Sequence, residues 1–93
     1  MEIKQCFLCG RNGNGDRLER HHIFGAANRD KSEKYDLVVY LCGERCHRLG
    51  KYSAHQNGKV ADYLHRYAQE KCMREQNWTK EEFAAVFGKN YLD

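Results

Sequence analysis

Two stretches decide how this chain folds: Arg20-His21-His22-Ile23-Phe24 and Leu41-Cys42-Gly43-Glu44-Arg45-Cys46-His47. The first stretch contains two adjacent histidines, His21 and His22. In the second stretch a third histidine, His47, directly follows a pair of cysteines. Imidazoles grouped in this way can bind a metal ion and leave one ring to act as a base near pH 7. We therefore expect the two stretches to face each other, with the cysteines fixing their geometry.

Four of the five cysteines form two short-spaced pairs, Cys6 with Cys9 and Cys42 with Cys46. Two such pairs can form a closed tetrahedral site for a structural Zn²⁺ ion. In a reducing compartment this spacing favours metal ligands over disulfides. Two alternatives are weaker: the cysteines are merely small buried residues, or His47 replaces one of them around the zinc.

The distribution of apolar residues predicts two strands in the first half of the chain. The strands are expected over 17–23 and 37–41, the second being β-branched and largely apolar. The polar segment 24–35 is interpreted as a loop with at most one helical turn. A helix is then expected to begin at Cys46 and to run toward Lys51.

Two further helices are predicted near the C-terminus, over 59–76 and 80–87. Thr79 and Glu82 have the spacing of a capping box, and Gly88 is expected to end the last helix. The apolar stripe of the longer helix is formed by Val60, Ala61, Leu64, Tyr67, Ala68 and Cys72. We expect Cys72 to be a free thiol of the core rather than a fifth metal ligand.

Size and composition indicate one α+β domain over residues 1–93, with a core over 6–51 and a helical extension over 59–93. The N-terminus does not resemble a signal peptide, and no apolar run is long enough to span a bilayer. We therefore expect a cytoplasmic protein with no membrane partner. The net charge is +3, and residues 1–58 carry 10 Lys and Arg against 7 Asp and Glu. This basic half suits an acidic ligand such as DNA.

The order Cys-x-x-Cys, His-His, apolar strand and Leu-Cys-x-x-x-Cys-His resembles the HNH endonucleases over residues 6–51. The resemblance implies a small ββα-metal core with a structural zinc bound by the four paired cysteines, followed here by the two C-terminal helices. It also implies that His21 and His47 bind a catalytic divalent metal, while His22 is the general base. The sequence around His-His-Ile-Phe-Gly is similar to that of small phage and prophage proteins.

What the resemblance implies is hydrolysis of DNA phosphodiester bonds to 5′-phosphate and 3′-hydroxyl ends. Neutral His22 takes a proton from water, and the metal ion neutralises charge on the phosphate. Arg20, Arg45, Arg48 and Lys51 lie near these histidines in the sequence and are candidate contacts to flanking phosphates. His55 is a further candidate, either as a metal ligand or as a polar loop residue without a role. His65 is interpreted as an ordinary helix residue.

The chain departs from the family pattern at two positions. The family's middle asparagine corresponds here to Leu37, so Asp36 is the first candidate and Asn28 the second for the residue that supports the base. Many members have Asp where His21 stands. An imidazole there should favour Mn²⁺, Ni²⁺ or Zn²⁺ over Mg²⁺ as the catalytic metal.

Two other functions fit the sequence less well. The first is a zinc-stabilised module that has the same fold and binds DNA or a protein partner without cutting. The second is a helical interaction domain over 59–93, which accounts for Trp78, Phe83 and Phe87 but gives the histidines no role. A protein partner or a homodimer is compatible with either function.

Overall fold

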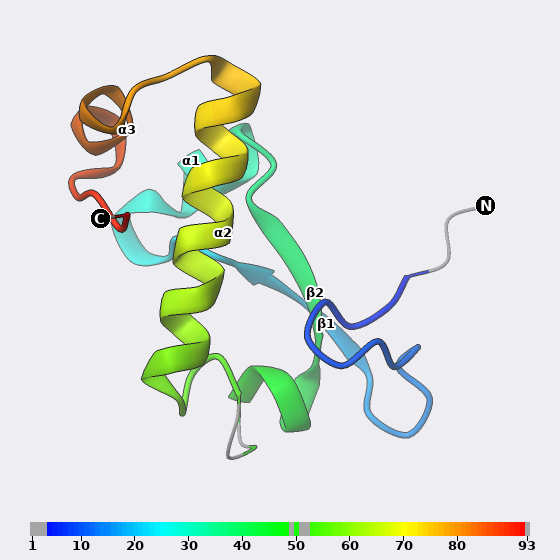
Figure 1. Cartoon of the computed structure of the whole chain (residues 1–93). Coiled ribbons are helices and arrows are strands. Elements are labelled where there is room, and N and C mark those ends of the chain that lie inside the picture. Colours follow the sequence, from blue (N-terminus) through cyan, green and yellow to red (C-terminus); the bar gives the residue numbers. More distant parts are fainter. Residues whose placement is uncertain (1–3, 49, 51–52, 93) are drawn as a thin grey trace. The chain divides into compact units, whose positions relative to one another are not determined.

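The computed structural model describes residues 4–48, 50 and 53–92. The chain forms β1 (Leu18–His22), a 3₁₀ helix η1 (Ala26–Asn28), α1 (Arg29–Lys34), β2 (Val38–Cys42), a π-type helix η2 (Gly43–Arg48), α2 (Gly58–Gln76) and α3 (Lys80–Phe87) (Figure 1). The two strands pair antiparallel in one sheet, which confirms the predicted α+β class. None of the helices in the described ranges combines the length and apolar character that crossing a bilayer requires.

Both strands and both C-terminal helices lie within one or two residues of their predicted bounds. The segment 24–35 contains more helix than predicted, because η1 and α1 follow each other there. The Ser32 hydroxyl explains this difference: it donates to the Phe24 carbonyl at 2.7 Å and accepts from the Phe24 N–H at 3.1 Å. The helix expected from Cys46 begins earlier, at Gly43, and Lys51 lies outside the described residues.

The chain divides into two compact units. The first contains residues up to 21 together with 38–61, and the second contains 22–37 together with 62–93. The sequence-based division into 6–51 and 59–93 differs from this, because 22–37 groups with the C-terminal helices. Within that second unit the Asn28 side-chain amide and the Lys31 ammonium donate to the carbonyls of Phe87 and Val86, the last residues of α3.

The first unit is organised around β2. Leu41 and Cys42 are fully buried, and the N–H of Gly43 bonds to the carbonyl of Arg17 at 2.8 Å, just before β1. The N-terminal segment joins the same strand, because the Phe7 N–H donates to the Tyr40 carbonyl at 2.8 Å. The N-terminal cysteine turn is therefore hydrogen-bonded to β2, and η2 begins directly where β2 ends.

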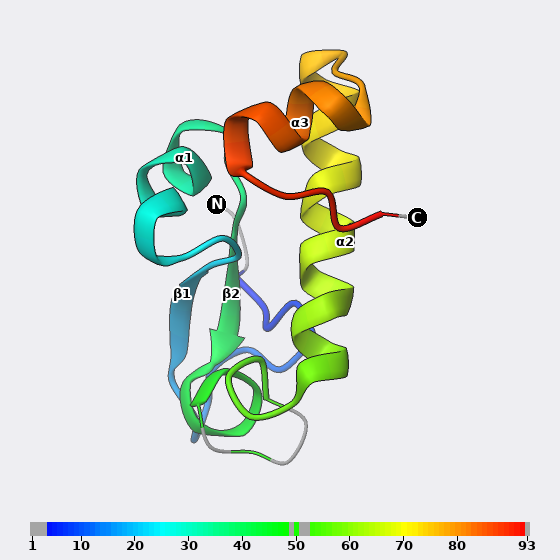
Figure 2. The same ribbon diagram turned by 90° about the vertical axis from the view of Figure 1, so that its left-hand side faces the viewer.

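The second unit has an aromatic core centred on Phe24. Its ring centroid lies 4.9 Å from that of Phe87, 5.6 Å from Phe83 and 5.2 Å from Tyr91. Figure 2 shows α3 turning back from the end of α2 toward α1. The half-buried His65 ring stacks on Phe24, and burial lowers its pKa. His65, which belongs to α2, is thus part of the aromatic core.

The buried face of α2 contains one polar residue that the predicted stripe did not include. Gln69 is fully buried beside Leu64, Ala68 and Cys72, and its amide is satisfied by the C-terminal tail. It donates to Asn90 Oδ1 at 2.7 Å and accepts from the Tyr91 N–H at 2.6 Å. Cys72 is a buried free thiol, as predicted, and burial raises its pKa.

The predicted capping box at the start of α3 is present. The Thr79 hydroxyl accepts from the Glu82 N–H at 3.1 Å, and the Glu82 carboxylate accepts from the Thr79 N–H at 3.1 Å. Gly88 ends the helix with φ of 88°, a left-handed conformation that favours glycine. Phe83 and Phe87 are buried as predicted, while Val86 is only half-buried.

Thr79→Ala is expected to lower the free energy of unfolding by about 1 kcal/mol, because one helical N–H loses its acceptor. Urea unfolding followed by circular dichroism measures this. Glu81→Gln is the control, since no capping hydrogen bond involves its side chain, and it should change stability by less than about 0.5 kcal/mol. Equal stabilities of Thr79→Ala and the parent protein would show that the box contributes nothing.

Candidate functional site

The four paired cysteines come together in the first unit. The sulfurs of Cys6, Cys9, Cys42 and Cys46 lie within 4.8 Å of one another, and those of Cys9 and Cys42 are 3.5 Å apart. A tetrahedral zinc ion with Zn–S bonds of about 2.3 Å separates its sulfurs by about 3.8 Å. The cluster therefore has the donor set and the spacing of a structural zinc site.

The pKa values of the thiols in this cluster are also consistent with a site that binds a cation. Burial tends to raise the pKa of Cys9, but hydrogen bonds from the Arg11 backbone and from the other thiols outweigh it and lower the pKa to about 6. Burial raises the pKa of Cys42 to about 11 and that of Cys46 further still. Without a cation these crowded thiols cannot all ionise, whereas a bound Zn²⁺ ion stabilises every thiolate.

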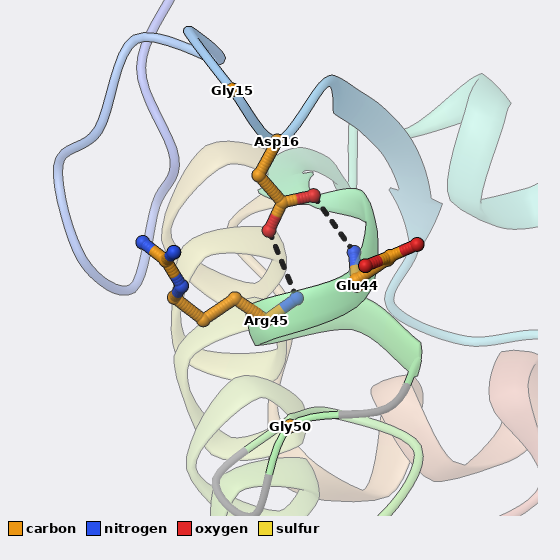
Figure 3. A pocket seen from close by; sticks show the side chains of 5 residues that line it. All are labelled: Gly15, Asp16, Glu44, Arg45 and Gly50. Atoms are coloured by element: carbon orange, nitrogen blue, oxygen red, sulfur yellow. Dashed lines mark hydrogen bonds between the residues drawn. The ribbon is translucent and has the colours of Figure 1, made fainter.

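The second cysteine pair is positioned by the junction between β2 and η2. Cys42 ends the strand and Cys46 lies one helical turn later, so both sulfurs point to one side. The Asp16 carboxylate fixes the start of η2 by accepting from the N–H groups of Glu44 and Arg45, both at 3.0 Å (Figure 3). These hydrogen bonds lower the pKa of Asp16 and keep it ionised.

Three histidines form a second cluster in the same unit. The ligand nitrogens of His21, His47 and His55 lie within 4.8 Å of one another, and the ring centroids are 4.8–5.4 Å apart. The Nε2 atoms of His47 and His55 are separated by 3.2 Å. Two imidazole nitrogens bound to one ion at about 2.0–2.1 Å lie about 3.3 Å apart. The cluster thus fits one divalent metal with three imidazole ligands.

His55 reaches this cluster through backbone pairing rather than through a regular element. The Ala54 N–H donates to the Cys46 carbonyl at 2.8 Å, and the His55 N–H donates to the His47 carbonyl at 3.1 Å. Ala54 and His55 are thereby held against η2. Burial, followed by the charge of His47, lowers the pKa of His55, which keeps its ring neutral and able to bind a metal.

Glu19 orients the central histidine of the cluster. His47 donates from Nδ1 to Glu19 Oε1 at 2.9 Å, which leaves the Nε2 lone pair directed at His55. The same oxygen also forms an ion pair with Arg48, whose Nε lies 3.2 Å away. The hydrogen bond from His47 lowers the pKa of Glu19, so the carboxylate stays ionised. Carboxylate–histidine pairs of this kind fix the tautomer of a metal ligand and increase its basicity.

Glu19→Gln is therefore expected to weaken divalent metal binding at the histidine cluster by about 10- to 100-fold. Isothermal titration with Ni²⁺ of protein loaded with one equivalent of zinc measures the affinity, because the four-cysteine site is then already filled and the histidine cluster is not. Glu44→Gln removes an exposed carboxylate from the same unit and should leave the affinity unchanged. Equal Ni²⁺ affinities for Glu19→Gln and wild type would show that Glu19 does not contribute to metal binding.

His22, the predicted base, belongs to the second unit and interacts there with Glu33. Its Nε2 lies 2.7 Å from Glu33 Oε1, and the His22 side chain is 14% exposed. The two predicted supporting residues have other partners. Asn28 donates to the Phe87 carbonyl, and Asp36 lies at a turn with φ of 58°, where its carboxylate is 3.4 Å from Lys71 Nζ.

The candidate phosphate contacts differ in their surroundings. Arg20 lies on an exposed position of β1, and Arg45 is exposed on η2. Arg48 is also exposed, but its guanidinium donates to the Gly43 carbonyl and forms an ion pair with Glu19, so part of its charge is neutralised. Lys51 lies outside the described residues.

Sequence reasoning missed three carboxylates: Asp16, Glu19 and Glu33. Glu19 had a signal, because it lies two residues before His21 in β1 and so shares a face with it. Asp16 and Glu33 had none, since their partners are 28 and 11 residues away.

Comparisons of the chain with protein-family models, with curated proteins and with solved structures found no match.

Proposed function

We propose that this chain is a metal-dependent endonuclease or nickase of the HNH type that hydrolyses DNA phosphodiester bonds. In this proposal β1, β2 and η2 form a ββα-metal core. The cysteine cluster holds a structural zinc ion behind η2, and the histidine cluster holds the catalytic metal. His22, which directly follows His21 in the chain, is the general base.

The observation that carries the proposal is the histidine cluster with its supporting carboxylate. Three protein ligands leave coordination positions open, as catalytic metal sites require and closed structural sites do not. The cluster is also accessible, since His21 and His47 are half-buried and His55 is exposed. The pairing of His47 with Glu19 is the kind of support that functional metal ligands have.

The donor set favours particular metals. Three neutral imidazoles and no carboxylate among the grouped ligands suit Mn²⁺, Ni²⁺ or Zn²⁺ better than Mg²⁺, which prefers oxygen ligands. When bound, such a cation supplies Lewis acidity that offsets charge on the phosphate and on the leaving oxygen. The additional imidazole from His55 strengthens the preference that His21 already indicated.

The residues of the chain supply proton transfer. His22 donates from Nε2 to Glu33, which leaves Nδ1 to take a proton from the attacking water. The Glu33 carboxylate then stabilises the imidazolium that forms, in the way that a buried acid supports the histidine of a hydrolase triad. Glu33 thus takes the supporting role for which Asp36 and Asn28 were the sequence candidates.

Charge distribution supports DNA as the substrate. The first unit carries 8 Lys and Arg against 4 Asp and Glu, whereas the second carries 8 against 9. The whole positive excess therefore belongs to the unit that contains both clusters. A phosphate backbone would be attracted to this unit, with Arg20 and Arg45 as candidate contacts.

A plasmid-nicking assay tests the proposal. Zinc-loaded protein should convert supercoiled plasmid to the open-circular form with Mn²⁺ or Ni²⁺, and more slowly with Mg²⁺. His47→Ala should lose the metal-dependent activity while keeping the structural zinc, measured by metal analysis. DNA binding without cleavage under Mg²⁺, Mn²⁺, Ni²⁺ or Zn²⁺ would contradict the enzyme and favour the zinc-stabilised binding module.

A further inference from the structure

The first unit contains a cavity of about 430 Å³ that the proposed chemistry does not use. Its walls come from the N-terminal turn, from η2 and from the start of α2. The lining residues are two apolar residues, two arginines, two cysteines of the cysteine cluster and a glycine: Leu8, Val60, Arg11, Arg45, Cys9, Cys46 and Gly50. This volume is within the range of about 300–1,000 Å³ found for ligand sites.

The cavity combines an apolar surface with two positive charges. Leu8 and Val60 are both half-buried, and Arg11 and Arg45 are exposed. Among the described residues neither guanidinium forms an ion pair. The Asp16 carboxylate accepts hydrogen bonds from the backbone N–H groups of Glu44 and Arg45. Arg11 is therefore available to an anion, whereas the charge of Arg45 is partly offset by Asp16, whose pKa it helps to lower, without an ion pair between the two.

Gly50 packs closely against the backbone of η2 in the wall of the cavity. A Cβ atom at this position would collide with the backbone carbonyl of Arg45, so no side chain can be placed there without a shift of the backbone. This part of the wall therefore requires glycine. A flat ring can lie against Leu8 and Val60 while guanidinium planes stack on it or bind its phosphate.

The cavity is adjacent in the chain to the histidine cluster. Cys46 lines it, and the next residue, His47, is a ligand of the proposed catalytic metal. We propose that the cavity binds one unpaired nucleotide of a DNA strand beside the bond that is cut. The base would lie on Leu8 and Val60, and the phosphate would contact Arg11 and Arg45. This inference rests on the proposed function and specifies its substrate class.

The reason for an unpaired nucleotide is geometric. A base inside a duplex has both faces stacked, so it enters a protein cavity only when it is single-stranded or extruded. Extrusion costs least where the base has no pairing partner. DNA with a single-stranded overhang, flap or gap should therefore bind better than an intact duplex.

Fluorescence anisotropy with the zinc-loaded full chain, without added catalytic metal, tests this. Two labelled duplexes that differ only by one unpaired nucleotide are compared, and we expect about tenfold tighter binding of the unpaired form. Val60→Phe fills the cavity and should reduce that ratio to about one, without weakening binding of the intact duplex. Val86→Phe, a half-buried valine of the second unit, is the matched control and should keep the ratio.

Arg11→Gln provides a readout that does not depend on refilling the cavity. It should lower the salt dependence of binding to the unpaired form by about one phosphate contact and leave that of the intact duplex unchanged. Zinc content and circular dichroism verify that each variant is folded. If Val60→Phe does not fold, Leu8→Phe from the opposite wall and Arg11→Gln decide the question.

The outcomes separate this inference from the proposed function. Equal affinity of wild type for both duplexes, together with metal-dependent nicking, would overturn the nucleotide subsite and leave the nuclease intact. A preference that Val60→Phe abolishes, without cleavage under any metal, would support the subsite and contradict the nuclease. Tighter binding of an unpaired ribonucleotide than of the deoxyribonucleotide would overturn the assignment to DNA.

Discussion

Cys42→Ser is expected to release the structural zinc and to unfold the unit that contains residues up to 21 and 38–61. Binding of a structural Zn²⁺ ion contributes an apparent 10–16 kcal/mol in small zinc domains, about as much as the whole stability of a typical domain. Cys42 is fully buried, and serine cannot replace a thiolate in the zinc shell. The free energy that holds the N-terminal turn against β2 would be lost.

The packing of this unit offers little to compensate. Its buried apolar residues include Val39, Leu41 and Ala54, a small set beside the buried cysteines themselves. The N-terminal turn is held by a few backbone hydrogen bonds, such as that from the Phe7 N–H to the Tyr40 carbonyl. Domains of this size commonly need a metal ion to complete their stability.

Metal analysis and thermal unfolding by circular dichroism measure the effect. Wild type should contain one tightly bound zinc, and Cys42→Ser should contain none and show a loss of ordered structure. Cys72→Ser is the matched control, because Cys72 is an equally buried cysteine that lies outside the cluster. It should keep the zinc and lose only about 1–3 kcal/mol from burying a hydroxyl. Stoichiometric zinc in Cys42→Ser would contradict the four-cysteine site.

Local patterns in the sequence predicted most of the secondary structure and the cysteine cluster. The two cysteine pairs, the β-branched strand and the Thr79–Glu82 box each depend on residues within a few positions of one another. Such patterns are set by backbone geometry, so they can be recognised without tertiary information. The same holds for Gly88, whose left-handed conformation ends α3.

Tertiary contacts determine what the sequence did not predict. α1 forms in a polar segment because the Ser32 hydroxyl bonds the backbone of Phe24, a contact that no periodicity indicates. His55 reaches the histidine cluster through a backbone pair eight residues from His47, and Glu33 reaches His22 across eleven residues. The sequence offered His55 as one candidate metal ligand and left its role open, and it gave no local signal for the contacts of Ser32 and Glu33.

His22→Ala is expected to reduce the rate of plasmid nicking by about 10²–10⁴-fold, the usual contribution of a general base. Metal binding should be retained, since the grouped ligand atoms in the described residues come from His21, His47 and His55. Loss of activity with unchanged Ni²⁺ affinity would therefore assign His22 to proton transfer rather than to the metal. His65→Phe is the matched histidine control, because that ring packs against Phe24 in the aromatic core, and it should keep its nicking activity.

Glu33→Gln tests how His22 is supported. Glutamine can still accept the hydrogen bond from Nε2, but it removes the negative charge beside the imidazolium that forms during proton transfer. Because the Glu33 side chain is 44% exposed, solvent screens that charge, and the expected loss of rate is about tenfold rather than the larger loss of a buried acid. Glu75→Gln, a carboxylate of similar exposure that lies beside Lys71, should leave the rate unchanged. A Glu33→Gln protein as slow as His22→Ala would mean that the carboxylate does more than stabilise charge. A His22→Ala protein as fast as wild type would place the base elsewhere in the chain, and the histidine cluster would then have to bind metal for another purpose.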